Sequence, residues 1–266
     1  MRLVVLGFGF QMPFDIGLVA AGLLVGFLVG VTGMGGGAVM TPFLISVVGV
    51  GPVVAVGTDL IYSSVTKIVG AWLHTRQRTV DFALVKRLAI GSVPAGLAAV
   101  AVLSLLPAAG VNADQAVKRA LGVVLVLVAA IMLWRIFATR ERTLPERWRA
   151  RLEGRGTVLA GVVVGALVGF TSVGSGALLV PFLICVYPLS PAKVVGTDVF
   201  HAAILVTVTG VAHAQSGSVD WALAVTLLAG SIPGVSIGTW MAPRAPVRLL
   251  RAGLASLLLI TGLNLM

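Results

Sequence analysis

The residues best suited to chemistry in this chain are the few ionisable side chains that interrupt long apolar runs. Asp59 and Asp198 each end a Gly-Thr-Asp sequence whose threonines are Thr58 and Thr197, and Lys67 follows Asp59 in the same run. An ionisable group inside a membrane costs upwards of ~2.5 kcal/mol, so it is usually paired or faces a cavity. Two interpretations of the aspartates stay open: they bind a coupling proton, or they cap backbone N–H groups where a helix restarts.

Two glycine-rich blocks are the second candidate for chemistry. Residues 32–37 read Thr-Gly-Met-Gly-Gly-Gly and residues 171–176 read Thr-Ser-Val-Gly-Ser-Gly. Glycine lets the backbone leave helical geometry and approach a ligand, and a helix that restarts afterwards offers free N–H groups to a small anion. Close helix packing through small residues is the alternative explanation. The predicted substrate-binding residues are Thr32, Gly33, Gly35, Gly36, Gly37, Thr171, Ser172, Gly174, Ser175 and Gly176.

Composition places these residues in a membrane protein. Of 266 residues, 58% are hydrophobic and only 11% are charged, whereas a soluble domain carries about 25% charge. The continuous apolar runs exclude an outer-membrane barrel, whose strands alternate polar and apolar positions. The formal net charge of +10 comes largely from short gaps between those runs, which is typical of cytoplasmic loops and not of a nucleic-acid-binding face.

Charges and Pro/Gly positions divide the chain into ten apolar segments, and the predicted fold class is an all-α polytopic membrane protein. The second and seventh segments are too short to span a bilayer comfortably and follow the glycine-rich blocks, so we expect short or re-entrant helices there. The predicted segments are 14–33, 35–50, 52–74, 82–106, 115–137, 156–172, 174–188, 191–213, 220–242 and 246–265.

An internal repeat relates the two halves. A shift of 139 positions aligns residues 26–99 with 165–238 without a gap, at about 28 identities in 74. The matches include both glycine-rich blocks, both Gly-Thr-Asp sequences and the pair His74 and His213. We therefore predict two membrane repeats, 1–138 and 156–266, joined by a basic linker, 139–155.

Lys67 and His201 break the symmetry of the repeat. Val206 occupies the position equivalent to Lys67, and Tyr62 the position equivalent to His201. Lys67 could supply a positive charge to an anion path, or extend toward the membrane surface. His201 shares a helix face with Asp198, three residues earlier, so any role for it would be specific to one half.

Basic residues predict that the repeats have inverted topology. The gap after residue 74 and the linker 139–155 are rich in Lys and Arg, whereas residues 213–220, which match that first gap, have none. If basic loops are cytoplasmic, equivalent loops face opposite sides, which an odd number of segments per repeat allows. We expect both termini outside and the linker in the cytoplasm. Inverted repeats with glycine-interrupted helices are common in secondary transporters.

The motifs resemble those of the TauE/SafE family of membrane permeases. The resemblance rests on Gly-Val-Thr-Gly-Met-Gly-Gly-Gly at 30–37, Pro-Phe-Leu at 42–44 and Gly-Thr-Asp at 57–59, together with their second-half copies, and it covers nearly the whole chain. It implies a transporter in a prokaryotic plasma membrane that exports sulfite or a small organosulfonate such as sulfoacetate. The expected partners are that anion and the lipid bilayer, with no nucleic acid and no cofactor or metal. The oligomeric state stays open, with a homodimer as one option.

Other functions are compatible with the same sequence. The chain could carry a different small anion, or form an anion channel. Gly174-Ser175-Gly176 with a later membrane histidine also suggests an intramembrane serine hydrolase, whose nucleophile would need an adjacent base. A two-fold repeat suits transport better than a single catalytic pair, so we predict a protein that is not an enzyme.

Overall fold

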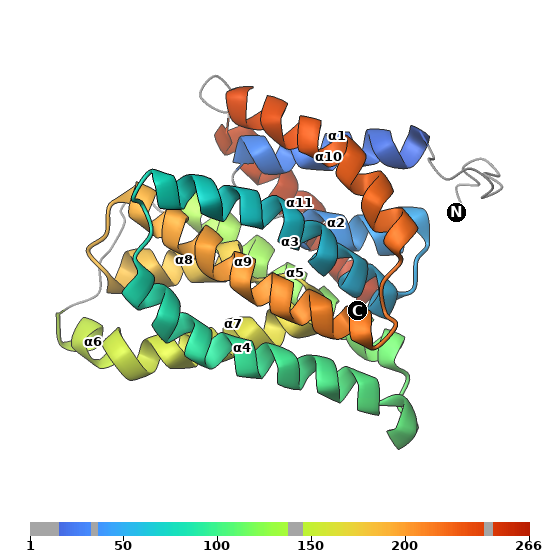
Figure 1. Cartoon of the computed structure of the whole chain (residues 1–266), viewed down its shortest axis with the longest axis horizontal. Helices are drawn as coiled ribbons and strands as arrows, with labels where there is room; N and C mark the ends of the chain where they lie inside the picture. Colours follow the sequence, from blue (N-terminus) through green and yellow to red (C-terminus); the bar gives the residue numbers. More distant parts are fainter. Residues whose placement is uncertain (1–15, 33–36, 138–145, 242–246) are drawn as a thin grey trace.

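The computed structural model describes residues 16–32, 37–137, 146–241 and 247–266, and the regular elements in these ranges are helices (Figure 1). A π-helical turn, Leu44–Val48, continues α2, and another, Leu152–Gly156, precedes α7. The α-helices are α1 (Ile16–Thr32), α2 (Gly37–Phe43), α3 (Pro52–Arg76), α4 (Phe82–Leu105), α5 (Ala113–Phe137), α6 (Glu146–Arg151), α7 (Thr157–Thr171), α8 (Ser175–Val186), α9 (Pro191–Gln215), α10 (Trp221–Met241) and α11 (Val247–Leu265).

These helices confirm the predicted all-α polytopic class. Six stretches of the described chain are long and apolar enough to cross a membrane: α3, α4, α5, α9, α10 and the stretch from Leu152 through α7. Each of the ten predicted segments coincides with a helical stretch, and α6 lies in the predicted linker. The two segments expected to be short are short in the structure. Helix α8 has 12 residues, and α2 with its π-helical turn extends from Gly37 only to Val48. At 1.5 Å per residue α8 is about 18 Å long, well under a hydrocarbon core of about 30 Å.

The short helices are arms of hairpins. The chain reverses after α7 at Ser172 and Gly174, whose φ angles are 61° and 131°. Tyr187, directly after α8, hydrogen-bonds to Thr157 at the start of α7, with 2.6 Å between the two hydroxyl oxygens. Helix α8 therefore returns to the side from which α7 began. Helices α1 and α2 make the corresponding hairpin from the opposite end of the molecule (Figure 1).

The two halves pack reciprocally. The first helix of each half lies along the fourth helix of the other, α1 on α10 and α4 on α7. A Cβ at Gly91 would meet the backbone oxygen of Val158, and a Cβ at the equivalent Gly230 would meet that of Val19. These glycines let the helix backbones approach closely, as small residues do in membranes. The halves are therefore interleaved, and the predicted boundaries at 138 and 156 stay a prediction about the repeat.

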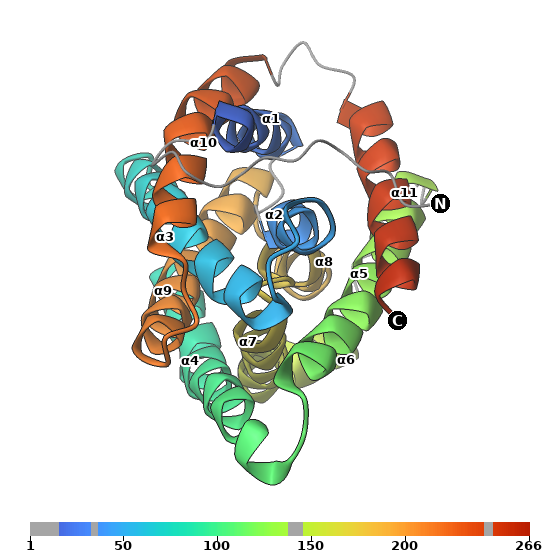
Figure 2. The ribbon, with the colours of Figure 1, turned by 90° about the vertical axis from the view of Figure 1, so that its right-hand side faces the viewer.

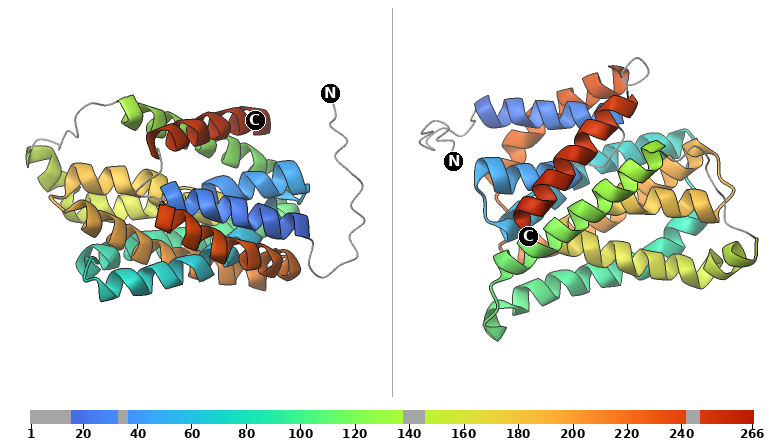
Figure 3. Two further views of the ribbon diagram at one scale, coloured as in Figure 1. Left: turned by 90° about the horizontal axis from the view of Figure 1, so that it is seen from above. Right: turned by 180° about the vertical axis from the view of Figure 1, so that it is seen from behind.

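Equivalent helices α3 and α9 run antiparallel to each other. Gly70 of α3 lies against Val199 near the start of α9, and Gly210 near the end of α9 lies against Leu60 and Ile61. Helices α5 and α11 also pair with each other, on one side of the molecule (Figure 3). Antiparallel equivalent helices are the arrangement expected of oppositely oriented repeats, whose orientation in a membrane stays a prediction.

The hairpin helices occupy the centre of the molecule. Figure 2 shows α2 and α8 nearly end-on, surrounded by the longer helices. Buried apolar side chains form two clusters around them, one that includes Met40 and Leu44 from the first hairpin and one that includes Leu179 and Leu183 from the second. This packing holds the starts of the two short helices deep inside the protein.

Candidate anion site

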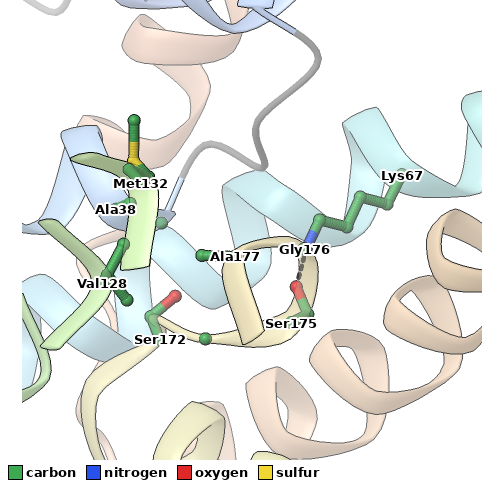
Figure 4. A pocket seen from close by; sticks show the side chains of 10 residues that line it. Ala38, Lys67, Val128, Met132, Ser172, Ser175, Gly176 and Ala177 are labelled. Carbon is green, nitrogen blue, oxygen red and sulfur yellow. Dashed lines mark hydrogen bonds between the residues drawn. The ribbon is translucent and has the colours of Figure 1, made fainter. Parts of the chain in front are cut away.

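A small central pocket is lined by the starts of both short helices (Figure 4). Gly37 and Ala38 begin α2, and Ser175, Gly176 and Ala177 begin α8. The pocket volume is about 20 Å³, room for about one water molecule. The fold therefore brings parts of the two predicted glycine-rich blocks together from opposite repeats. The other lining residues are Lys67, Val128, Met132, Ser172 and Gly174.

Lys67 reaches this pocket from α3. Its Nζ donates a hydrogen bond to Ser175 Oγ at 2.9 Å, drawn as a dashed line in Figure 4. Ser175 is the first residue of α8, which begins without a side-chain cap. The first turn of such a helix presents backbone N–H groups and the positive end of its dipole. An ammonium group and an uncapped helix start together suit a small anion.

Asp59 is the most heavily hydrogen-bonded side chain beside the pocket. It is fully buried inside α3. Its Oδ2 accepts from Thr41 Oγ1 at 2.6 Å and from Ser172 Oγ at 2.8 Å, and its Oδ1 accepts from Ser63 Oγ at 3.4 Å. Since Thr41 belongs to α2 and Ser172 to the turn before α8, Asp59 fastens both hairpins to α3.

Asp198, the equivalent aspartate in α9, has a different environment. It is also buried, yet its Oδ1 has no hydrogen-bond partner among the described residues. The positive charge of Lys67 lies within electrostatic range of both Asp198 and Asp59. Both aspartates lie inside continuous helices, so neither occupies the helix-start position that the capping interpretation requires.

Thr58 and Thr197 are not among the residues that line the pocket, and they link the two repeats through hydrogen bonds. Thr58 Oγ1 accepts from the backbone N–H of Asp220 at 3.0 Å, and Thr197 Oγ1 accepts from that of Asp81 at 3.0 Å. Asp81 caps the start of α4 with its carboxylate, which accepts from two backbone N–H groups of the first turn. In each Gly-Thr-Asp sequence the threonine therefore binds the start of a helix in the other half, whereas the aspartate is buried in the interior.

His201 does not line the pocket. Its ring is buried, and Nε2 lies 2.8 Å from Ser92 Oγ of α4. His213 donates from Nε2 to the backbone oxygen of Gly169 at 3.0 Å. The charge of Lys67 does reach His201 electrostatically. The side chain that hydrogen-bonds to Ser175 is thus Lys67, whereas the two histidines hydrogen-bond to Ser92 and Gly169.

Of the remaining predicted residues, the structure describes the two threonines and does not describe three of the glycines. Thr171 supports the hairpin turn, because its Oγ1 donates to Leu167 O at 2.7 Å and accepts from the N–H of Val173 at 3.3 Å. Thr32 ends α1. The other predicted residues, Gly33, Gly35 and Gly36, lie outside the described part of the chain.

Four side chains of the site, two polar and two apolar, were not predicted from the sequence. Ser63 lies one helical turn after Asp59, a spacing at which side chains meet, so it could have been found. Thr41 contacts Asp59 across two elements, and no local signal distinguishes it from a threonine packed in a membrane helix. Val128 and Met132 of α5, which line the pocket, also give no signal in the sequence.

Comparison with known proteins agrees with the motif resemblance. The chain matches the family described as "Sulfite exporter TauE/SafE" over residues 18–265. It is 46% identical over 254 residues to the probable membrane transporter protein YjnA of Bacillus subtilis, covering 94% of this chain and 99% of that protein. A probable membrane transporter protein of Xylella fastidiosa is 31% identical over 234 residues, 85% of this chain and 84% of its own length.

No solved structure matches the chain. The family match and the first relative each extend over almost the whole sequence, and they are described as a sulfite exporter and as a probable membrane transporter protein. The apolar helices of the described chain are those of a multi-pass membrane protein. The chain therefore belongs to the TauE/SafE sulfite exporter family of membrane transporters.

Proposed function

We propose that this protein exports a small sulfur-containing anion, such as sulfite or an organosulfonate, by alternating access at the interface of its repeats. The observation that carries the proposal is the convergence of Lys67 Nζ, Ser175 Oγ and the uncapped start of α8 on one pocket. Backbone N–H groups, hydroxyls and one ammonium can together hold a tetrahedral or pyramidal oxyanion. The family description supports sulfur chemistry, and the physical site supports an anion.

The pocket volume supports alternating access over an open channel. A space of about 20 Å³ holds about one water molecule, so a sulfite-sized anion fits only after the walls separate. Most of the lining residues belong to two hairpins that enter from opposite ends. Each hairpin can withdraw toward its own side and open the pocket to that side alone. This is how broken helices at the interface of inverted repeats work in many secondary transporters.

Basic residues support the direction and orientation in the proposal. The turn between α3 and α4, and the linker around α6, lie at the same end of the molecule (Figure 1). Their Lys and Arg residues favour the cytoplasm, which would put both termini outside a prokaryotic plasma membrane. A potential negative inside then drives an anion outward, by about 2.3 kcal/mol per charge per 100 mV.

Sulfite efflux from proteoliposomes tests this function. We expect the purified protein to release internal sulfite at a saturable rate when a potential is imposed without a pH gradient. If the protein also carries sulfonates, it should release internal sulfoacetate at a saturable rate under the same conditions. Saturation is expected because the anion occupies a closed site once per cycle. Discrete single-channel currents would instead favour an anion channel. An absence of efflux of both anions from folded protein would contradict the proposed substrate class.

The contact between Lys67 and Ser175 favours one second candidate, an intramembrane serine hydrolase. A lysine can serve as the base for a serine nucleophile, and the two side chains are within hydrogen-bond distance at 2.9 Å. In the transport proposal Lys67 is instead an ammonium donor to the hydroxyl. Labelling with a fluorophosphonate probe separates the two, since reaction at Ser175 that is lost in Ser175→Ala would establish a nucleophile.

A further inference from the structure

The two equivalent aspartates differ in every hydroxyl that surrounds Asp59. The side chains that donate to Asp59 are Thr41, Ser63 and Ser172. The positions equivalent to these three are Val180, Ala202 and Gly33, none of which carries a hydroxyl. A carboxyl with this environment and a carboxyl without it are chemically different groups, although the repeat places them at the same position.

The hydrogen bonds of Asp59 use its carboxylate as an acceptor. A proton on Oδ2 would compete with the bonds from Thr41 at 2.6 Å and Ser172 at 2.8 Å, which fasten the two hairpins to α3. A proton on Oδ1 would compete with the longer bond from Ser63 at 3.4 Å. A proton on Oδ1 of Asp198 would disrupt no hydrogen bond, because that buried atom has no partner among the described residues. The hydrogen bonds therefore favour Asp198 over Asp59 as the site of an exchangeable proton.

The net charge around the pocket favours proton binding to Asp198 when an anion is present. Lys67 is within electrostatic range of both carboxylates, and one ammonium with two carboxylates leaves a net charge of 1 − 2 = −1 around the pocket. Val206 stands where a second lysine would be, so the repeat supplies no further cation. A net negative, poorly solvated site repels an anion. One proton on Asp198 removes that charge and leaves Lys67 free to attract the ligand.

Other titratable groups near Asp198 are few. Helix α3 carries Lys67, Asp59 and the buried Tyr62, and α9 itself carries His201, whose Nε2 faces Ser92 of α4. The basic residues Lys86 and Arg87 of α4 are exposed. Within the described helices α7 and α8, the titratable side chain is the half-buried Cys185.

We propose that Asp198 takes up one proton as the anion binds beside Lys67, while Asp59 remains ionised as the positioning residue that holds the hairpins. This proposal rests on the proposed function, because it describes how the same pocket accepts an anion. The proton passes from water to Asp198 Oδ1, and it leaves again with the anion. A dianion would then cross with one proton and a net single negative charge, which a potential negative inside still drives outward.

Proton uptake on sulfite binding is the direct test. Sulfite is added to the purified full-length protein in weakly buffered detergent solution at matched pH, and the change in pH and the amount of bound sulfite are measured together. We expect the wild type to take up about one proton more per bound anion than Asp198→Asn, because the amide cannot be protonated near neutral pH. Protons that sulfite itself exchanges are common to both proteins and cancel in the difference.

A second variant keeps the carboxylate and changes only its surroundings. Val180→Thr gives Asp198 the hydroxyl that Thr41 gives Asp59, and a new hydrogen bond to the ionised form should weaken proton binding roughly fivefold. We therefore expect the pH at which sulfite affinity falls by half to move down by about 0.7 unit. The control is Val195→Thr, the same change at a more exposed position of α9, which should leave that pH unchanged.

The outcomes separate this proposal from the proposed function. Saturable sulfite transport with equal proton uptake in the wild type and Asp198→Asn would overturn the role of Asp198 and leave the transporter in place. If Asp198→Asn does not fold, an unchanged pH profile in Val180→Thr would overturn it equally. Failure of the wild type to bind or transport sulfite would overturn the proposed substrate, and the proposal with it.

Discussion

Replacing Lys67 by Met should reduce sulfite transport by about 10- to 100-fold. Lys67 is the one ammonium that lines the central pocket in the described chain, and its Nζ is within hydrogen-bond distance of Ser175 at the start of α8. Hydrogen bonds to a charged group are worth about 1.5–3 kcal/mol, which corresponds to that range. Methionine keeps the length and apolar stem of the side chain, so the loss reports the charge. The measurement is the initial rate of sulfite efflux from proteoliposomes.

The matched control is Lys86→Met, which makes the same chemical change at an exposed position of α4. It should transport within about twofold of the wild type, because surface charges contribute little. Lys67→Arg is expected to restore only part of the activity, since the planar guanidinium is larger than the ammonium it replaces in a pocket this small. Wild-type efflux by correctly folded Lys67→Met would contradict the placement of the anion at this pocket.

Replacing Gly91 or Gly230 by Ala should destabilise the protein by more than about 3 kcal/mol, at the upper end of overpacking effects. The new Cβ at Gly91 would meet the backbone oxygen of Val158, and the one at Gly230 would meet that of Val19. Backbone cannot move aside as the end of a flexible side chain can, so the two helices would have to separate. Because the two positions are equivalent in the reciprocal packing, the two variants should lose a similar amount of stability.

Gly253→Ala in α11 is the control for this pair. A Cβ there has no atom within 4 Å among its surroundings, so alanine should be neutral or stabilise the helix by up to about 1 kcal/mol. The measurement is the fraction of purified protein that elutes as a single species, together with its melting temperature in detergent. A stable Gly91→Ala or Gly230→Ala protein would show that the helix pairs are not packed as closely as described.

Much of the architecture was predictable because each membrane segment needs a continuous apolar run. The charges and turn residues that bound α3, α4 and α9 are visible in the sequence, and the helices follow them closely. The course of the short segments was not predictable. A hairpin and a pair of full crossings both leave the next segment on the same side of the membrane. The positions of the basic loops are therefore compatible with either course. The structure shows that α7 and α8 turn back, through the reversal at Ser172 and Gly174 and the contact between Thr157 and Tyr187.

The candidate site was predictable where residues repeat in both halves, or where a charge interrupts an apolar run. Both glycine-rich blocks and Lys67 were identified from sequence, and the described parts of the blocks meet around one pocket. The distinct work of Thr58 and Asp59 was not predictable, because neighbouring residues on a helix point in different directions and only the fold shows what each one meets. Two partners of Asp59, Thr41 and Ser172, come from other segments, so no spacing along the chain predicts them.

Equilibrium binding of sulfite to the purified protein and to a pocket-filling variant tests the central claim most directly. Ala177 lines the pocket in the first turn of α8, and Ala177→Leu adds three carbons to a space of about 20 Å³. The control is Ala98→Leu, the same change at an exposed position of α4. We predict saturable binding to the wild type and to Ala98→Leu, and at least about tenfold weaker binding to Ala177→Leu, the effect of about 1.4 kcal/mol. Equal binding to all three folded proteins would place the anion elsewhere and contradict the account.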